Sequence, residues 1–218
     1  SILRKPVEVV SPSFKYHRHN VWLGYRNSGF QVISQNRIAY KKANDNPLTK
    51  ATKGMAMLCM AAVGNHLLAG TALRVFIYDL QNRRIGQTPF RNIFDSVPAP
   101  QKINLNNIVM YDDEHAWMVS GHQVASCRIS DECADVLHKS PVLKSLLGYG
   151  LKVGDALYVC SEGRNLLRFR FGNLQPDTIP IPNANYDHEN KMEKLADGNI
   201  LLFMQGMHLA ILSPKTGK

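Results

Sequence analysis

Few residues have the types and spacings needed to bind a metal or catalyse a reaction. His17 and His19 are two residues apart, which on a strand places both imidazoles on one face, but no acidic residue or cysteine accompanies them. Because zinc sites combine several Cys, His or carboxylate ligands, we expect no metal there. Residues 112–115, Asp-Asp-Glu-His, offer acids and a base, but they fall where the repeat described below has a hairpin turn. We interpret them as a turn.

No motif of a nucleophile elbow, a phosphate-binding loop or a pair of catalytic carboxylates stands out. A lyase or hydrolase would need His and Glu side chains clustered on one face, and His122 with His208 is a slender basis for such a site. We therefore expect a protein that is not an enzyme and that has no cofactor.

The four cysteines include no C-x-x-C pair, which argues against a zinc knuckle or a thioredoxin-like site. Cys59 and Cys160 lie in apolar runs and are expected to be buried and inert. Cys127 and Cys133 flank the turn-like sequence Ile-Ser-Asp-Glu, so a hairpin could bring them together. A disulfide would also need suitable geometry and an oxidising compartment, and the sequence leaves this pairing open.

Composition indicates a globular protein: 44% of the 218 residues are hydrophobic and 20% are charged. The formal net charge is +9, which would suit an anionic partner such as nucleic acid or an acidic glycan. Basic residues do not form a run of five or more, so we expect a diffusely basic surface and no nucleic-acid partner. No uninterrupted apolar run is long enough for a membrane segment.

The elements that position the candidate residues come from an internal repeat. A short apolar run that starts at a polar or turn-forming residue recurs at 20–24, 65–70, 115–121, 155–160 and 199–206. Aligned on Trp22, Leu67, Trp117, Leu157 and Ile200, the copies are 45, 50, 40 and 43 residues apart. This period is typical of the blades of a β-propeller. The two tryptophans occupy this repeated position, so we expect them to pack between blades.

Each copy is the second strand of a predicted four-stranded unit. First strands are expected at 57–63, 108–111, 152–153 and 192–195; third strands at 29–33, 74–78, 123–129, 166–171 and 208–212; and more polar fourth strands at 37–41, 84–89, 134–138 and 177–181. Helical signals are almost absent, and we interpret 141–147 as a loop. The sequence predicts an all-β fold, a β-propeller of about five four-stranded blades forming one domain over residues 1–218.

The ends of the chain leave ring closure open. Residues 2–10 look like an outer strand with no repeat before it, and the last copy supplies three strands. The N-terminal strand could complete the last blade and close the ring, or the repeats could belong to a larger propeller of the seven-bladed type. We favour the larger propeller.

Two segments resemble the two-component regulator propeller repeat: 21–32, which contains Trp22-Leu-Gly24, and 67–79, which contains Leu68-Ala-Gly-Thr71 and ends in Tyr78-Asp79. Residues 44–48 look like the linker of that family. The later copies depart from its Trp-Ile-Gly-Thr core, and no kinase, receiver or DNA-binding segment is present. The resemblance implies the extracytoplasmic sensor region of a hybrid histidine kinase, as in Bacteroidetes, which detects an oligosaccharide in the periplasm.

The binding site expected for such a sensor is the ring of turns between the second and third strands, which open on the same face as the links between blades. These turns supply hydrogen-bond donors suited to a neutral or acidic oligosaccharide. The candidate ligand-binding residues are Arg26, Asn27, Arg74, His122, Arg164, Asn165 and His208. Ordinary solvated turns are the alternative interpretation.

The functional hypothesis is a ligand-sensing propeller that signals to a kinase elsewhere in the same polypeptide. Its partners would be the oligosaccharide, the remaining blades and the kinase module, and a homodimer is an open alternative. A protein-interaction scaffold of the WD-repeat type is the second hypothesis, although the Gly-His and Trp-Asp signatures are missing. A propeller lyase or hydrolase is the third.

Overall fold

The computed structural model describes residues 13–17, 20–25, 29–34, 47–95, 104–162, 165–181, 191–204 and 208–214. Within these ranges the strands form five antiparallel sheets, each built from strands that follow one another in the sequence. We call these sheets blades 1 to 5 in chain order. None of the helices in the described ranges is long and apolar enough to cross a membrane.

The strands have the following bounds. Blade 1 contains β1 (Ser13–His17), β2 (Asn20–Tyr25) and β3 (Gly29–Ser34). Blade 2 contains β4 (Met57–Val63), β5 (His66–Thr71), β6 (Arg74–Asp79) and β7 (Ile85–Pro89). Blade 3 contains β8 (Leu105–Met110), β9 (His115–Ser120), β10 (Val124–Ile129) and β11 (Ala134–Lys139). Blade 4 contains β12 (Leu147–Val153), β13 (Ala156–Ser161), β14 (Asn165–Arg170) and β15 (Asn173–Pro180). Blade 5 contains β16 (Lys191–Lys194), β17 (Ile200–Met204) and β18 (His208–Leu212).

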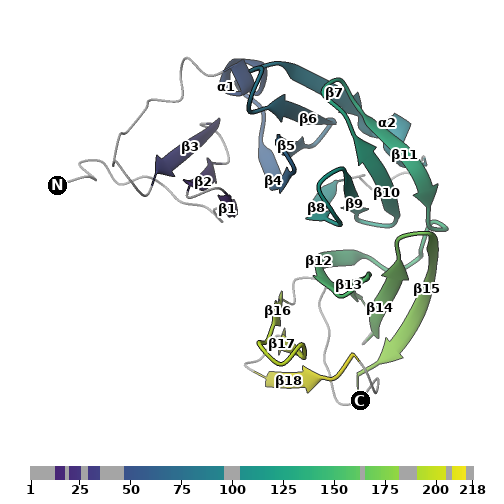
Figure 1. Cartoon of the computed structure of the whole chain (residues 1–218). Coiled ribbons are helices and arrows are strands. Elements are labelled where there is room, and N and C mark those ends of the chain that lie inside the picture. The colour runs from purple at the N-terminus through teal and green to yellow at the C-terminus, as the bar shows by residue number, and fades with distance from the viewer. Residues whose placement is uncertain are drawn as a thin grey trace.

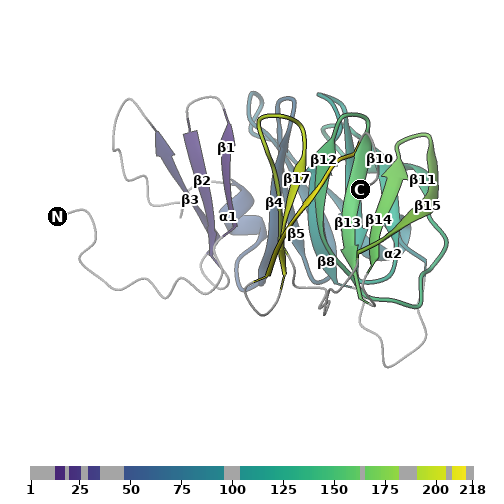
Figure 2. The ribbon, with the colours of Figure 1, turned by 90° about the horizontal axis from the view of Figure 1, so that it is seen from below.

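The blades stand side by side in an arc, as Figure 1 shows. The first strand of each blade lies on the inside of the arc and contacts the first strand of the next blade, while β7, β11 and β15 form the outer rim. The strands run roughly along the axis of the arc, so the turns collect on its two faces (Figure 2). This arrangement is that of a β-propeller, and it confirms the predicted fold class.

Both faces of blade 4 are buried against the neighbouring blades. In β13, Leu157 and Val159 pack against blade 3, whereas Tyr158 and Cys160 pack against blade 5. Successive residues of a strand point to opposite faces of the sheet, so a strand between two blades must be apolar at every position. This requirement explains why the second strand of each repeat is a continuous apolar run in the sequence.

The alignment of the repeats is off by one residue at Trp117. Trp117 is fully buried, and together with Val119 it packs against Phe169 of blade 4, the following blade. Leu67 and Leu157, with which it was aligned, face the preceding side of their own blades. The turn before β9 is longer than the two-residue turns before β5 and β13, and a shift of one residue moves a side chain to the other face. Trp117 therefore packs between blades as expected, but on the opposite face.

Two short helices lie in the links between blades and were not predicted. They are α1 (Pro47–Ala51), which follows the linker-like sequence, and α2 (Phe90–Ile93). Each buries apolar side chains: Leu48 in α1, and Phe90 and Ile93 in α2. Helices this short carry no periodic pattern in the sequence, so tertiary packing decides them. Residues 141–146, in contrast, form no helix, which agrees with the predicted loop.

The predicted strands overlap the observed ones, but β8 and β15 begin at Leu105 and Asn173, earlier than the predicted 108 and 177, and β1 was not predicted. First strand β12 begins at Leu147, whereas the sequence indicated 152–153. Gly150 is closely packed, since a Cβ there would lie 2.9 Å from Leu157 Cδ1 and would displace that side chain. The predicted strands at 2–10 and 37–41 lie outside the described residues.

All four cysteines are free thiols. Cys59 and Cys160 are buried as predicted, and burial raises the pKa of Cys160 to about 12. Cys127 lies inside the ladder opposite Val136, and its pKa is likewise raised to about 12, mainly by burial. Cys133 lies in the turn, where its Sγ donates a hydrogen bond to Asp135 Oδ1 at 3.2 Å. The hairpin thus does not join Cys127 to Cys133.

Thiol titration tests this arrangement. We expect the unfolded, non-reduced protein to show all four thiols, and the native protein to react rapidly at Cys133 alone, because the other three are buried. The variant Cys133→Ser should abolish the rapid reaction. If two thiols became titratable only after a reductant was added, a Cys127–Cys133 disulfide would be established instead.

Candidate functional site

The turns between second and third strands share one face of the arc with the links between blades, and we call this the link face. Hydrogen bonds join turn to link: the Gly121 amide donates to the Asn104 carbonyl at 3.1 Å, and the Leu147 amide donates to the Gly121 carbonyl at 2.8 Å. In the preceding blade, the Phe90 amide donates to the Leu73 carbonyl at 3.0 Å. The predicted geometry of the turns is therefore present in the described part of the ring.

A hydroxyl side chain shapes two of these turns. Thr71 Oγ1 accepts from the amides of Leu73 and Arg74, and Ser120 Oγ accepts from those of His122 and Gln123. Each hydroxyl ends the second strand of its blade, and Ser161 ends β13 in the same way. In blade 3, serine therefore takes the place of threonine without loss of the turn.

The structure places Arg74, His122 and Asn165 on the link face of three successive blades. Arg74 Nη1 donates to Gln87 Oε1 at 2.8 Å, so its guanidinium reaches across to the outer strand β7. His122 is only 4% exposed, and its Nδ1 lies 3.1 Å from the Leu143 carbonyl. Asn165 is half-buried at the start of β14. The described contacts thus tie Arg74 to its own blade and His122 to the following link.

The side chains of the remaining candidates lie outside the described part of the chain. Arg26, Asn27 and Arg164 fall outside the described residues, as do His19 and the side chain of His17. His208 begins β18, and its side chain is also outside the description. Among the described residues, no group of three or more His, Cys, Asp or Glu is placed to hold a metal ion.

Gln123 is the last residue of the turn between β9 and β10. It is almost fully buried, and its Nε2 donates to Asp95 Oδ2 at 2.8 Å and to the Ser140 carbonyl at 2.7 Å. Its Oε1 accepts from the Asp95 amide at 2.9 Å. The Gln123 amide, followed by the Lys139 ammonium, holds the pKa of Asp95 below its ordinary value. The side chain of Gln123 is therefore hydrogen-bonded to the link before blade 3, at Asp95, and to the link after it, at Ser140.

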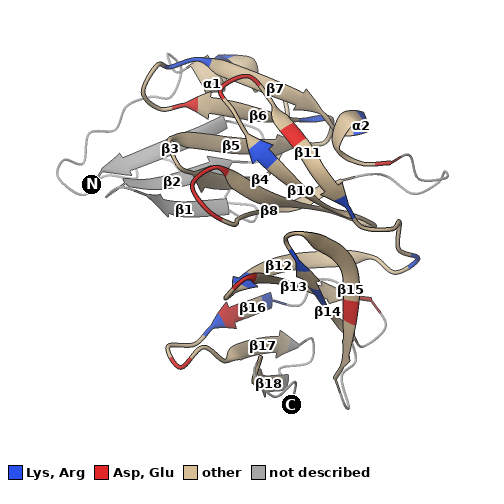
Figure 3. Ribbon diagram, turned by 45° about the vertical axis from the view of Figure 1, so that its right-hand side comes forward, with Lys and Arg blue, Asp and Glu red and all other residues tan. Residues whose placement is uncertain are grey.

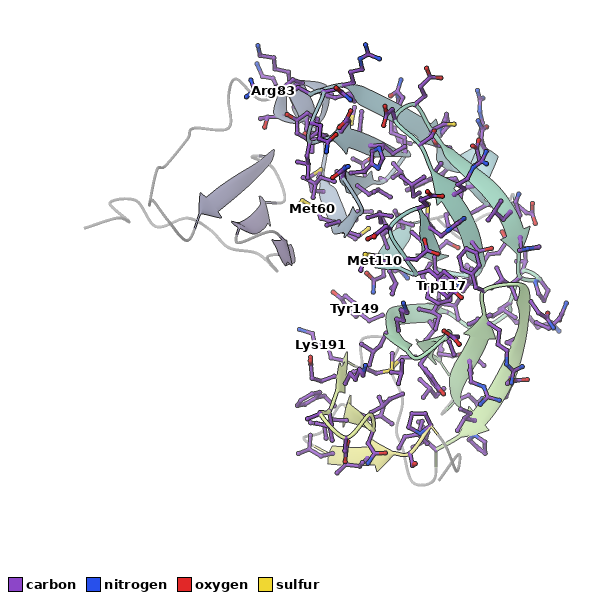
Figure 4. All side chains as sticks on the ribbon, viewed as in Figure 1. Met60, Arg83, Met110, Trp117, Tyr149 and Lys191 are labelled. Atoms are coloured by element: carbon purple, nitrogen blue, oxygen red, sulfur yellow. The ribbon has the colours of Figure 1, made fainter. Side chains whose placement is uncertain are left out.

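A set of residues on the inner edge of the arc was not predicted from the sequence. Each of β4, β8 and β12 has a bulge at the end nearest the link face, where the ladder skips Leu58, Asn106, and Gly148 with Tyr149. A bulge leaves a residue unpaired and re-aims its side chain. Figure 4 places Tyr149 on the inner edge of the arc, in line with Met110 and Lys191.

Two side chains of blade 3 donate hydrogen bonds to the bulge of blade 4. Asn106 Nδ2 donates to the Leu147 carbonyl at 2.5 Å, and Asn107 Nδ2 donates to the Gly150 carbonyl at 2.9 Å. These bonds satisfy carbonyls on both sides of Tyr149 and fix the backbone that carries it. Tyr149 is 44% exposed, although most large side chains of the blades are buried. Tyr149 is thus an exposed aromatic residue next to the link face, on a backbone segment that is hydrogen-bonded to blade 3.

The two faces of the arc carry different charge. On the link face, among the described residues, exposed bases outnumber exposed acids: Lys50, Lys53, Arg91, Lys139 and Lys144 against Asp95 and Glu162. On the opposite face the order is reversed, with Arg83, Arg84, Arg170 and Lys194 against Asp112, Asp113, Glu114, Asp131, Glu132, Asp155 and Asp197. Figure 3 shows the acidic positions concentrated at the hairpin turns. The described link face therefore attracts anions more strongly than the opposite face.

Two His–Asp pairs lie on the opposite face. His66 Nε2 is 2.7 Å from Asp131 Oδ1 of the next blade, and His115 Nδ1 is 2.8 Å from Asp112 Oδ1. Partial burial would raise the pKa of Asp112, but hydrogen bonds from the Glu114 amide and from His115 outweigh it, and the pKa is lowered. Asp112 also accepts from the His115 amide, so the acidic run 112–114 is a hairpin turn, as interpreted from the sequence.

The chain resembles other propellers in fold but not in sequence. No family model matches it, and no curated protein matches it in sequence. A WD40 β-propeller domain, that of Doa1, superposes with a TM-score of 0.64 at 16% identity, over 94% of this chain and 64% of the other. The extracellular domain of a hybrid two-component system, BT4673 from B. thetaiotaomicron, superposes with a TM-score of 0.65 at 14% identity, over 94% of this chain and 26% of the other.

A computationally designed protein, Ika8, is also similar, with a TM-score of 0.62 at 10% identity, over 94% of this chain and 58% of the other. The chain thus spans less than two thirds of each of these three structures. At such low identities the similarity establishes the fold alone.

The role of Gln123 can be tested by substitution. We expect Gln123→Leu to lower the free energy of unfolding by about 1–3 kcal/mol, because the carbonyl of the buried Ser140 and the two groups of Asp95 would lose their hydrogen bonds to Gln123. The pKa of Asp95 should rise toward its ordinary value, since Gln123 is the main cause of its depression. A depressed carboxyl pKa stabilises the fold above the unfolded pKa and loses that contribution as pH falls, so the acid dependence of stability should weaken.

Urea unfolding at several pH values would measure both effects. The exposed Gln175, changed to Leu, is the matched control and should leave stability within about 0.5 kcal/mol of the parent. An unchanged stability of the Gln123 variant would show that the turn is held by other contacts.

Proposed function

We propose that this chain is a ligand-sensing propeller that binds an oligosaccharide, preferably an acidic one, on the link face. The observation that carries the proposal is the exposed ring of Tyr149, which stands on the inner edge of the arc beside a face where bases outnumber acids. An aromatic ring offers an apolar platform for the C–H face of a sugar, and nearby cations pair with carboxylate or sulfate groups. Side chains of Arg26, Asn27, Arg74, Arg164, Asn165 and His208 would complete such a site.

The setting proposed is extracytoplasmic, in the periplasmic part of a sensor protein whose kinase lies elsewhere in the same polypeptide. Support comes from the fold shared with the extracellular domain of a two-component system and from the repeat-like segments around Trp22 and Leu68. In this proposal the chain performs no catalysis and holds no cofactor. A ligand would signal by binding one arrangement of the sensor more tightly than another.

His122 has a different part in this proposal from the one first expected. Because it is buried and hydrogen-bonded to the link at Leu143, it would position the link face and would not contact a ligand directly.

A protein-interaction scaffold is the second candidate. Leu73 and Val142 expose apolar side chains on the link face, at 67% and 42% of their surface, as a protein partner would require. The fold shared with a WD40 domain is compatible with this role.

Calorimetry against neutral and acidic oligosaccharides tests the first candidate. Tyr149→Ala should weaken binding about tenfold, since loss of an aromatic contact costs on the order of 1 kcal/mol. Arg26→Ala and Arg164→Ala should weaken binding of acidic ligands, with a smaller effect at high salt. The matched control is Leu137→Ala, which removes a similarly exposed side chain from the outer strand β11 and should bind normally.

The possible results separate the candidates. Full binding by Tyr149→Ala would remove Tyr149 from the site. No binding by a folded chain would favour the scaffold, and release of a cleaved product would favour a lyase or hydrolase.

A further inference from the structure

Blade 5 exposes an apolar sheet face. On this face Leu209 and Ile211 of β18 are 64% and 62% exposed, and Phe203 of β17 is 44% exposed. They are neighbours across the ladder, where Phe203 pairs with Leu209 and Leu201 pairs with Ile211. We call Leu201, Phe203, Leu209 and Ile211 the terminal face. Clusters of large apolar side chains in solvent mark interaction sites.

The same ladder positions are buried in the other blades. In blade 4 the corresponding pairs are Tyr158 with Arg168 and Cys160 with Leu166. Tyr158, Cys160 and Leu166 are at most 2% exposed, because blade 5 covers them.

Blades 2 and 3 repeat this pattern. The pairs are Leu68 with Ile77 and Gly70 with Val75 in blade 2, and Trp117 with Ser126 and Val119 with Val124 in blade 3. Leu68, Val75 and Ile77 are covered by blade 3, and Trp117, Val119 and Val124 are covered by blade 4. A Cβ at Gly70 would lie 2.5 Å from Leu105 Cδ2 of blade 3, so this position also faces the next blade. The terminal face therefore continues an interface that recurs three times in the described chain.

The opposite face of blade 5 has the pattern that its partner should have. Ile200, Leu202 and Leu212 alternate with the terminal-face residues along β17 and β18, and they are buried against blade 4. A blade that covers the terminal face would present apolar residues at these same positions. The space beside blade 5 lies at the open end of the arc (Figure 1).

We propose that the terminal face is the docking surface for a sixth propeller blade, supplied by the same polypeptide outside residues 1–218. The continuity with three existing interfaces supports a blade as the occupant. The WD40 domain of Doa1 and the BT4673 extracellular domain extend beyond the part that this chain matches, which supports a source in the same polypeptide. The inference concerns how the domain is completed, and it does not depend on the proposed ligand.

Cysteine labelling tests the proposal. In a Cys133→Ser background, Leu209→Cys and the control Leu137→Cys would be labelled with a maleimide, both in this 218-residue chain and in the complete product of the gene. Both sites should react at similar rates in the 218-residue chain, because both side chains are exposed. In the complete product we expect Leu209→Cys to react at least about tenfold more slowly than Leu137→Cys, since a docked blade must open first.

Equal rates in the complete product would overturn the proposal, as would a gene product with no further blade. Slow labelling in the 218-residue chain, together with a dimer in sedimentation analysis, would assign the face to a second copy and would also overturn it.

A charged side chain gives an independent test. Ile211→Lys should leave the unfolding midpoint of the 218-residue chain unchanged and lower that of the complete product, because only there would the lysine be buried. Leu137→Lys, on the outer rim, should change neither midpoint. A complete product as stable with Ile211→Lys as without it would contradict a docked blade.

Discussion

The structure depends on the alternation of side chains along strands that lie between two neighbouring blades. Each residue of a second strand must pack either against the preceding blade or against the following one, as Leu157 and Tyr158 do on the two faces of β13. Burial of apolar surface on both faces is the main favourable contribution to this fold. A blade holds its shape because its neighbours are present, and it has little core of its own.

This constraint also positions the residues that can contact a ligand. Bulges recur at the same end of the first strands β4, β8 and β12. The side-chain amides of Asn106 and Asn107 donate hydrogen bonds to the bulge that carries Tyr149. The turns of the link face are fixed by hydroxyl caps and by Gln123. The interior packing is thus uniform along the arc, whereas the exposed side chains of the inner edge and link face differ from blade to blade. Function in such a fold resides in these varied positions.

The fold was predictable from the sequence because its physical basis is repeated. Apolar second strands, two-residue hairpin turns and a period near that of a propeller blade are visible in the residues themselves. The face of Trp117 was not predictable, because it depends on the length of one turn. The start of β12 was not predicted, because glycine is uncommon in strands. Only the structure shows that Gly150 lies in close contact with Leu157.

The candidate site was predictable only in outline. The turns do lie on the link face, yet His122 is buried and hydrogen-bonded to the Leu143 carbonyl, and no sequence pattern predicts this contact. Tyr149 and Leu58 are exposed by bulges, and a bulge leaves no reliable mark in a single sequence. The opposite charges of the two faces also emerge only after the turns have been assigned to one face or the other.

Native-state hydrogen exchange resolved by strand tests most directly the claim that each blade is stabilised by its neighbours. The account predicts the slowest exchange in β5, β9 and β13, whose residues are buried on both sides, and faster exchange in β17 and β18, which are covered on one side only. Equal protection of β13 and β17 in the 218-residue chain would contradict it, because the blades would then be stable without neighbours on both faces.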